Sequence, residues 1–240
     1  MALFVDDPVF DWVEDIAPCV GTSGDHVEII ASPTKFYEKL KELAGKAKQR
    51  VVLSSLYLGT GKLEEDLVLK LADALRRHEE STDFRMLILL DHTRATRQTD
   101  TGDSSCRMLQ RLFRGKAGEK LQVRLFHTPS LRGWLKRVLP ARWNEIVGLQ
   151  HMKLYIFDDD VVVSGANLSE SYFTNRQDRY VLVRNCKRLA DYYTGIVDAV
   201  ASCSCELQPS GSIGLARDCH VHPYEGSSTT KKLRDVFCKD

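Results

Sequence analysis

The sequence contains no apolar run close to the length of about 18 residues that a membrane-spanning helix requires. Any contact with a membrane is therefore expected to be peripheral. The net charge is also small, because 34 Lys and Arg residues and 33 Asp and Glu residues give a formal charge of +1. No global basic field favours DNA or RNA, so we expect no nucleic acid partner.

Cysteines are few and scattered. Seven of them in 240 residues are an odd number and do not form the dense framework of a small secreted domain. We therefore expect mostly reduced thiols. A zinc cluster is the alternative near the carboxyl end, although its spacing matches no standard zinc finger; its candidate residues are Cys203, Cys205, Cys219, His220 and His222. We expect no metal and no cofactor.

The first residues, Met-Ala-Leu-Phe-Val-Asp-Asp, carry early acids and no Arg-rich amphipathic stretch. This pattern is typical of neither a signal peptide nor a transit peptide. We therefore expect no targeting segment in these 240 residues.

Apolar patterning predicts an α/β fold. The composition, 43% hydrophobic and 28% charged, suits a chain that buries a core. Strand-like runs at 50–58, 84–90 and 121–126 alternate with amphipathic helical patterns at 33–48, 63–79 and 187–201. Such alternation predicts a sheet with helices on both faces. We place this domain at 25–202 and expect 203–240, which carries no periodicity, to be a linker or irregular tail.

One stretch carries the chemistry. Residues 154–157 (Leu-Tyr-Ile-Phe) predict a strand, and side chains alternate between the faces of a strand. His151 and Lys153 would therefore point the same way, which suits a phosphate that Lys153 binds while His151 attacks or protonates. Asp158 has the opposite parity at the strand end, so it is interpreted as a structural anchor rather than a nucleophile.

A turn follows at Ser164-Gly165-Ala166-Asn167-Leu168-Ser169 and leads into a helix, whose first N–H groups are free to bind an anion. Asn167 fits an ordinary helix cap, and that role is compatible with donation to a phosphate. Either Ser164 or Ser169 would assist.

The run from Gln150 to Tyr180 resembles the HxKxxxxD signature of the phospholipase D superfamily, and within it the mitochondrial phosphatidylglycerophosphate synthase branch. The resemblance covers about 25–202 and implies a phospholipase D-like sandwich with a mixed sheet. It implies a catalytic set of His151, Lys153 and Asp158, and a phosphate site at Gly165, Asn167 and Ser169. It also implies that Asp178 orients the histidine; the alternative is a surface acid paired with Arg176 or Arg179.

The same resemblance implies a phosphatidyltransferase that converts CDP-diacylglycerol and glycerol 3-phosphate to phosphatidylglycerophosphate and CMP through a phosphatidyl-histidine. Such an enzyme belongs to the phosphatidylglycerol and cardiolipin pathway of the mitochondrion. Superfamily sites use two facing His-x-Lys motifs, whereas this sequence has one. We expect either a truncated form that is inactive alone or a homodimer that completes the site. The alternatives are a lipid-binding fragment and another phospholipase D-type phosphodiesterase.

Three further segments are candidates. Gly59-Thr60-Gly61-Lys62 lacks the flanking residues of a phosphate loop, so a plain turn is favoured over nucleotide binding. The basic, apolar stretch 131–139 predicts a helix that either touches a membrane interface or packs on the sheet. Asp91 and His92 follow a strand, where a local cap is favoured over a metal or acid–base pair.

Overall fold

The computed structural model describes residues 11–128 and 148–216. These residues form a nine-stranded mixed sheet with the strand order β1-β7-β6-β5-β2-β3-β4-β8-β9. Strands β2, β3 and β4 run parallel, and the other neighbouring strands pair antiparallel. In chain order they are β1 (Val27–Ile30), β2 (Arg50–Ser54), β3 (Arg85–Asp91), β4 (Leu121–Phe126), β5 (Leu154–Phe157), β6 (Asp160–Ser164), β7 (Tyr180–Val183), β8 (Cys205–Leu207) and β9 (Ile213–Leu215).

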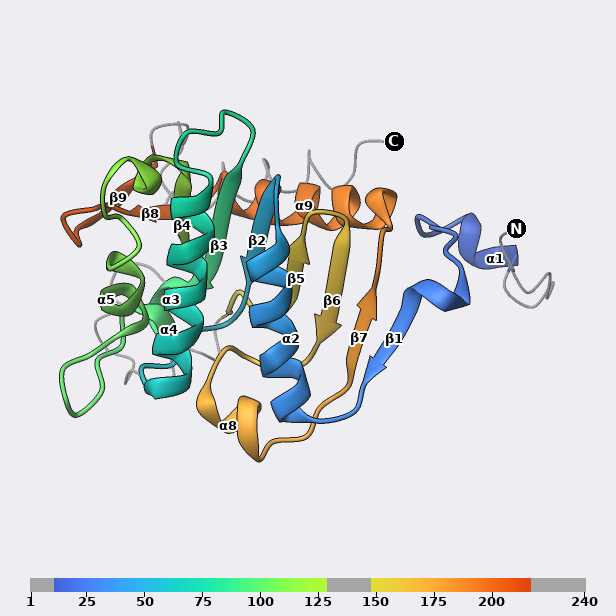
Figure 1. Cartoon of the computed structure of the whole chain (residues 1–240), viewed down its shortest axis with the longest axis horizontal. Coiled ribbons are helices and arrows are strands. Elements are labelled where there is room, and N and C mark those ends of the chain that lie inside the picture. Colours follow the sequence, from blue (N-terminus) through green and yellow to red (C-terminus); the bar gives the residue numbers. More distant parts are fainter. Residues whose placement is uncertain (1–10, 129–147, 217–240) are drawn as a thin grey trace.

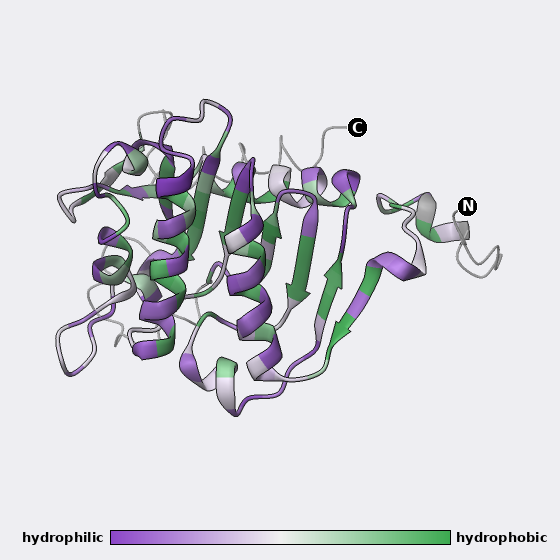
Figure 2. Ribbon diagram, in the orientation of Figure 1, coloured by the Kyte–Doolittle hydropathy of each residue, from purple (hydrophilic) through white to green (hydrophobic). Residues whose placement is uncertain are grey.

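Helices cover both faces of this sheet, as the sequence predicts (Figure 1). Helices α2 and α3, with the shorter α5, lie over one face, and α9 crosses the other. The described helices are α1 (Asp11–Glu14), α2 (Pro33–Lys46), α3 (Lys62–Arg77), α4 (His92–Ala95), α5 (Ser105–Gln110), α8 (Glu170–Thr174) and α9 (Lys187–Ala201), with 3₁₀ turns η2 (Gly24–His26) and η3 (Lys116–Lys120). Figure 2 shows hydrophobic strands between helices whose outer surfaces are hydrophilic.

Strand parity divides the core into two layers. Tyr155 and Phe157 of β5 pack in the layer beneath α2 and α3, whereas Leu154 and Ile156 pack in the layer beneath α9. Met152, just before the strand, packs against that second layer. The predicted alternation is thus confirmed, although the strand begins at Leu154 and leaves the His-x-Lys pair in the segment that precedes it.

Helix α2 shows how local sequence sets an element. The hydroxyl of Ser32 accepts a hydrogen bond from the Lys35 N–H (3.3 Å), and Pro33 occupies the first turn, where its missing N–H does no harm. The apolar stripe at Phe36, Leu40 and Leu43 is buried against the sheet. The predicted helix is therefore confirmed to within two residues of its predicted end.

The region after residue 202 differs from the prediction. Strand β8 pairs with the edge of β4, and β9 pairs with β8, so the chain returns to the sheet instead of leaving it as an irregular tail. Leu207 is only 1% exposed. Strands of three residues are too short to produce a periodic signal, which explains the error. Residues 217–240 lie outside the described part of the chain.

The described residues also bear on the cysteines, the zinc alternative and membrane-spanning helices. Cys19, Cys106 and Cys186 are free thiols. No group of three metal-ligating side chains occurs in 11–128 or 148–216, while Cys219, His220 and His222 of the zinc alternative lie outside those ranges. No helix within the described ranges has the length and apolarity to cross a bilayer. The predicted helix at 131–139 lies outside the described residues.

Candidate active site

The predicted site lies at one end of the sheet, next to α8 (Figure 1). Because β2 and β3 are parallel and β5 runs antiparallel to β2, the carboxyl ends of the first two strands meet the amino end of the third. Ser54 of β2 is opposite Leu154 of β5, and β3 ends at Asp91. Polar side chains that follow buried strands are thereby gathered beside His151.

Lys153 is largely buried, at 7% exposure, while His151 faces solvent. The Lys153 ammonium donates a hydrogen bond to the His151 carbonyl oxygen (2.8 Å), which holds the charge close to the histidine. Burial lowers the pKa of Lys153 to about 8, and the Asp178 carboxylate acts in the opposite direction. A cationic site for an anion is therefore available at neutral pH.

The histidine is suited to nucleophilic attack. Loss of solvation on its packed side and the Lys153 charge both lower the pKa of His151 below its usual value, and the Asp91 carboxylate partly opposes them. A lowered pKa leaves the imidazole neutral at pH 7, and the neutral ring is the form that can attack phosphorus.

Asp91 anchors the segment that carries His151. Its carboxylate, 1% exposed, accepts hydrogen bonds from the N–H groups of Arg94 (3.0 Å) and Gln150 (3.2 Å) and from the Thr93 hydroxyl (2.6 Å). Burial raises its pKa. The favoured interpretation of Asp91 as a cap of α4 is confirmed, and the same carboxylate also holds the residue before His151.

The turn after β6 brings Asn167 and Ser169 to the same end of the sheet. Asn167 is 4% exposed, and within the described residues its side-chain oxygen has no hydrogen-bond partner. The Ser169 hydroxyl lies 3.2 Å from that of Tyr57. An amide oxygen only accepts hydrogen bonds and so cannot bind a phosphate oxygen, whereas the NH2 group of the same amide can donate to one.

Asp178 has other partners than the sequence predicts. Its carboxylate accepts hydrogen bonds from the N–H groups of Gly165 (3.1 Å) and Arg179 (2.6 Å), and its charge acts on Lys153. It supports the turn and the lysine rather than contacting the histidine ring. A Cβ atom at Gly165 would lie 2.7 Å from that carboxylate, which explains glycine at this position.

Comparison with known proteins gives this geometry a context. No protein-family model matches the chain. It is 46% identical over 220 residues to the mitochondrial CDP-diacylglycerol–glycerol-3-phosphate 3-phosphatidyltransferase of Gallus gallus, covering 90% of this chain and 39% of that protein. With the Homo sapiens protein of the same name the identity is 43% over 237 residues, 95% of this chain and 42% of the relative. The chain is a homologue of these phosphatidyltransferases. It spans about two fifths of their length.

Solved structures identify the fold. A phosphatidylserine synthase of Haemophilus influenzae superposes with a TM-score of 0.64 at 20% identity, covering 95% of this chain and 47% of that one. Nuc, a phospholipase D family member of Salmonella typhimurium, gives 0.53 at 14% identity, covering 75% and 96%. The predicted phospholipase D-like fold is confirmed.

Asp158, the last residue of the His-x-Lys signature, lies away from His151 and Lys153. It follows Phe157 at one end of β5, whereas His151 and Lys153 precede Leu154 at the other end, and four residues of strand span about 13 Å. Its carboxylate accepts hydrogen bonds from the N–H groups of Lys48 (2.8 Å), Gln49 (2.7 Å) and Arg50 (3.0 Å). These contacts are those of the structural anchor that strand parity predicts, and they hold the carboxylate at the end of β5 away from His151.

The glycine turn at 59–62 is hydrogen-bonded to the turn at 164–169. The Gly59 N–H donates to the Leu168 carbonyl (2.8 Å), and Leu58 pairs with Leu168. The buried carboxylate of Glu64 lies against the glycines and accepts a hydrogen bond from the Glu170 N–H. An acid in this place excludes a phosphate from that side of the turn, so the nucleotide interpretation fails there, while Lys62 is an exposed residue at the start of α3.

Sequence reasoning missed several residues at this end of the sheet. The Gln150 amide donates to the Ser54 hydroxyl, and the buried ring of His127 meets that of His92 at 5.1 Å between centroids. The available signal is positional, because Ser54 ends β2 and His127 directly follows β4, and these two strands flank β3 in the parallel part of the sheet.

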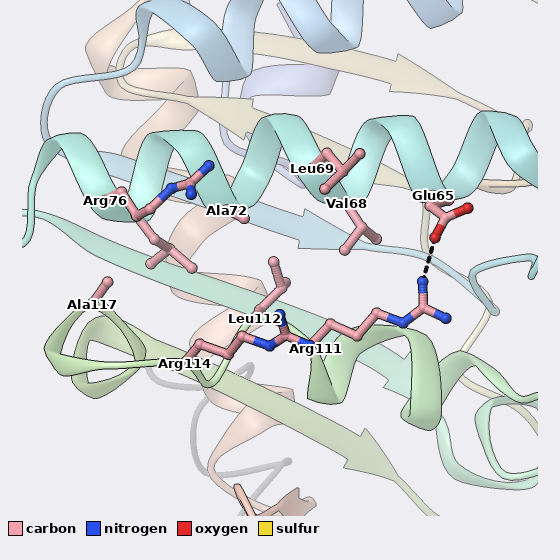
Figure 3. Close-up of a pocket in the computed structure, with 10 residues that line it drawn as sticks. Glu65, Val68, Leu69, Ala72, Arg76, Arg111, Leu112, Arg114 and Ala117 are labelled. Atoms are coloured by element: carbon pink, nitrogen blue, oxygen red, sulfur yellow. Dashed lines mark hydrogen bonds and ion pairs between the residues drawn. The ribbon is translucent and has the colours of Figure 1, made fainter.

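The largest hollow among those described is elsewhere. About 510 Å³ in volume, it lies between α3 and the segment from α5 to η3, with Val68 and Leu112 in its wall and the Glu65–Arg111 ion pair (2.6 Å) at one end (Figure 3). It contains none of the residues that surround His151, so it is separate from the candidate site.

Proposed function

We propose that this chain carries the nucleophilic half of a phosphatidyltransferase that acts on CDP-diacylglycerol and glycerol 3-phosphate. The observation that carries the proposal is the contact between the His151 carbonyl and the largely buried Lys153 ammonium, in a sequence 43–46% identical to enzymes of that name. We further propose a mitochondrial location, because those relatives are named mitochondrial. Peripheral contact with the membrane follows from the lipid substrate.

In the first step a ring nitrogen of His151 attacks the phosphorus that bears the diacylglycerol group. The new N–P bond forms as the bond to CMP breaks, and CMP leaves with the electron pair. Lys153 and the Asn167 amide stabilise the charge that develops on the phosphoryl oxygens. In the second step the primary hydroxyl of glycerol 3-phosphate forms the new O–P bond, the N–P bond breaks, and the hydroxyl proton must pass to a base.

The single His-x-Lys motif leaves this base unassigned. Residues 1–240 contain one His-x-Lys motif, and the relatives are more than twice as long as the matched region. We propose that the second group comes either from a segment beyond this sequence or from a second copy of the chain. A binding fragment without activity is the second candidate, and the single motif is the observation that favours it.

The experiment uses CDP-diacylglycerol labelled in its diacylglycerol part, mixed with an excess of the purified chain. Label should become attached to His151 in an acid-labile bond, and His151→Asn should abolish attachment. His26→Asn, a histidine at the distant β1 end, is the matched control and should label like the wild type. A wild-type chain that binds the lipid but never acquires label would leave the binding-fragment alternative.

Acceptor choice separates the proposal from other phospholipase D-type reactions. Label should move from the protein to glycerol 3-phosphate in preference to serine or water once the missing group is supplied. Preferential release to water would identify a phosphodiesterase instead.

A further inference from the structure

A small hollow of about 160 Å³ adjoins the candidate site and has an unusual lining. Its wall contains two guanidinium groups, four hydroxyl side chains and, among the described residues, no carboxylate; it consists of Tyr57, Leu58, Gly59, Thr60, Arg94, Arg97, Gln98, Thr99 and Ser105. Each of four other hollows described for the chain is lined by at least one Asp or Glu. The lining of this hollow is therefore suited to an anion.

Two sets of contacts connect the hollow to the site. Arg94 lies in α4, whose cap Asp91 also binds the backbone of Gln150, the residue before His151. On the other side, the Tyr57 hydroxyl meets that of Ser169, and the Arg94 guanidinium lies 4.8 Å from the centre of the Tyr57 ring. Residues of the hollow are thus linked to Ser169 on one side of the candidate site and, through Asp91, to Gln150 on the other.

The acceptor in the proposed reaction carries a phosphate group that needs a binding site of its own. Glycerol 3-phosphate brings a phosphomonoester of its own, which must be bound away from the phosphorus that His151 attacks because like charges repel. Arginine is the side chain best suited to that task, since its planar fork matches phosphate oxygens and keeps its charge at every physiological pH.

We propose that the hollow lined by Arg94 and Arg97 binds the phosphate group of the acceptor, and so leaves the free hydroxyl directed toward His151. The inference rests on the proposed function for the identity of the acceptor. It also gives a role to part of the turn at 59–62, because Gly59 and Thr60 line the hollow whereas Glu64 does not.

Arg97 is the better residue to test, because Arg94 also stacks on Tyr57 and its loss would disturb that ring. Calorimetric titration of the full chain with glycerol 3-phosphate should show at least about tenfold weaker binding for Arg97→Gln, the loss expected for one charge-assisted contact. Arg97→Lys should recover part of the affinity. Arg188→Gln, an exposed arginine on α9 at the other face of the sheet, is the matched control and should bind like the wild type.

Glycerol without phosphate separates charge recognition from recognition of the alcohol. It should bind equally weakly to the wild type and to Arg97→Gln. Equal affinity of both proteins for glycerol 3-phosphate would overturn the proposal. If Arg97→Gln does not fold, amide shifts in the wild type serve instead: glycerol 3-phosphate should move Thr60 and Gln98, and unmoved signals there would overturn it.

The outcomes also distinguish this inference from the proposed function. Labelling of His151 by CDP-diacylglycerol with unchanged glycerol 3-phosphate affinity in Arg97→Gln would retain the function and reject the hollow. Loss of that affinity in a chain that never acquires label would retain a phosphomonoester site and reject the function.

Discussion

Burial of the Lys153 ammonium group lowers the stability of the fold, although the proposed function needs this charge. An ammonium group at 7% exposure loses most of its hydration, and its pKa falls from the model-compound value of 10.5 to about 8. Its one hydrogen bond goes to a carbonyl oxygen. The folded protein therefore keeps a charged group whose burial lowers its stability, as expected for the phosphate ligand proposed above.

Replacing this lysine with methionine should stabilise the protein. Because the folded-state pKa lies below the unfolded-state value, the unfolded chain binds more protons between pH 8 and 10.5, and the wild type gains stability as pH rises through that window. Lys153→Met should therefore raise the free energy of unfolding by roughly 1–3 kcal/mol at pH 7, and less at pH 9.5. Urea unfolding at both pH values measures this.

The exposed Lys70→Met on α3 is the control and should change the free energy of unfolding by less than about 0.5 kcal/mol. Lys153→Met should also prevent labelling of His151. A variant that is less stable than the wild type at pH 7 would show that the charge contributes to the fold.

Asp158 is the opposite case, an acid whose work is structural. Its carboxylate accepts from three consecutive backbone N–H groups at the start of β2, and the residue itself has a positive φ of 52°. Asp158→Ala should cost about 2–3 kcal/mol in the free energy of unfolding, since the N–H groups lose a charged acceptor and alanine strains at that φ. Asp158→Asn should cost less, because asparagine keeps an acceptor and tolerates this conformation.

Chemical denaturation measures those free energies of unfolding. Labelling by CDP-diacylglycerol then compares the reactivity of His151 in the Asp158 variants with that in the wild type. Folded Asp158→Asn should label at His151 as the wild type does. Loss of labelling at unchanged stability would return Asp158 to the reaction centre.

At the scale of elements, two short strands decide how one edge of the sheet is closed. Without β8 and β9, the edge of β4 would present unpaired backbone groups. Leu207 of β8 belongs to the main core, whereas Leu215 of β9 is 44% exposed. The two leucines therefore form a matched pair for testing whether this region is part of the domain.

Leu207→Ala should lower the free energy of unfolding by about 2–4 kcal/mol through lost burial and the cavity left behind. Leu215→Ala should lower it by less than about 1 kcal/mol. Thermal or urea unfolding distinguishes them, and equal, negligible effects would mean that the region beyond residue 202 behaves as a tail in solution.

The arrangement of elements also explains why the two turns near the site act together. The Gly59 N–H binds the Leu168 carbonyl, and the Glu64 side chain reaches the first turn of α8. These contacts fix the Asn167–Ser169 turn against the start of α3.

At the scale of the whole molecule, the single His-x-Lys motif has different consequences for the two chemical steps. CMP leaves as a phosphate whose second pKa is about 6, so its departure at pH 7 needs no proton. Attack by a primary hydroxyl does need a base. The part of the chemistry that one motif can perform is therefore the first step.

We predict that the isolated chain releases at most one equivalent of CMP per molecule and then stops. Quenched-flow measurement of CMP, with excess CDP-diacylglycerol and glycerol 3-phosphate, tests this. Release should be stoichiometric with label on His151 and absent in His151→Asn. Continuous turnover would contradict the prediction, and a rate per molecule that rises with protein concentration would identify a second copy as the source of the base.

The sequence by itself determined the features that depend on near neighbours. Strand parity separated Tyr155 from Ile156, Ser32 and Pro33 set the start of α2, and the spacing of His151 and Lys153 placed a histidine next to a lysine. These features follow from backbone geometry over a few residues, which a linear pattern records. Even Asp158 was correctly interpreted from its parity as an anchor.

Only the tertiary structure decided the rest, because the contacts involved join residues far apart in the chain. Asp91 reaches Gln150 across 59 positions, Tyr57 reaches Ser169 across 112, and no local pattern encodes either pairing. The Arg94–Arg97 hollow and the return of β8 to the sheet depend on the same long-range packing. A sequence motif specifies which groups can react, whereas the tertiary structure determines which residues surround these groups and shift their pKa values.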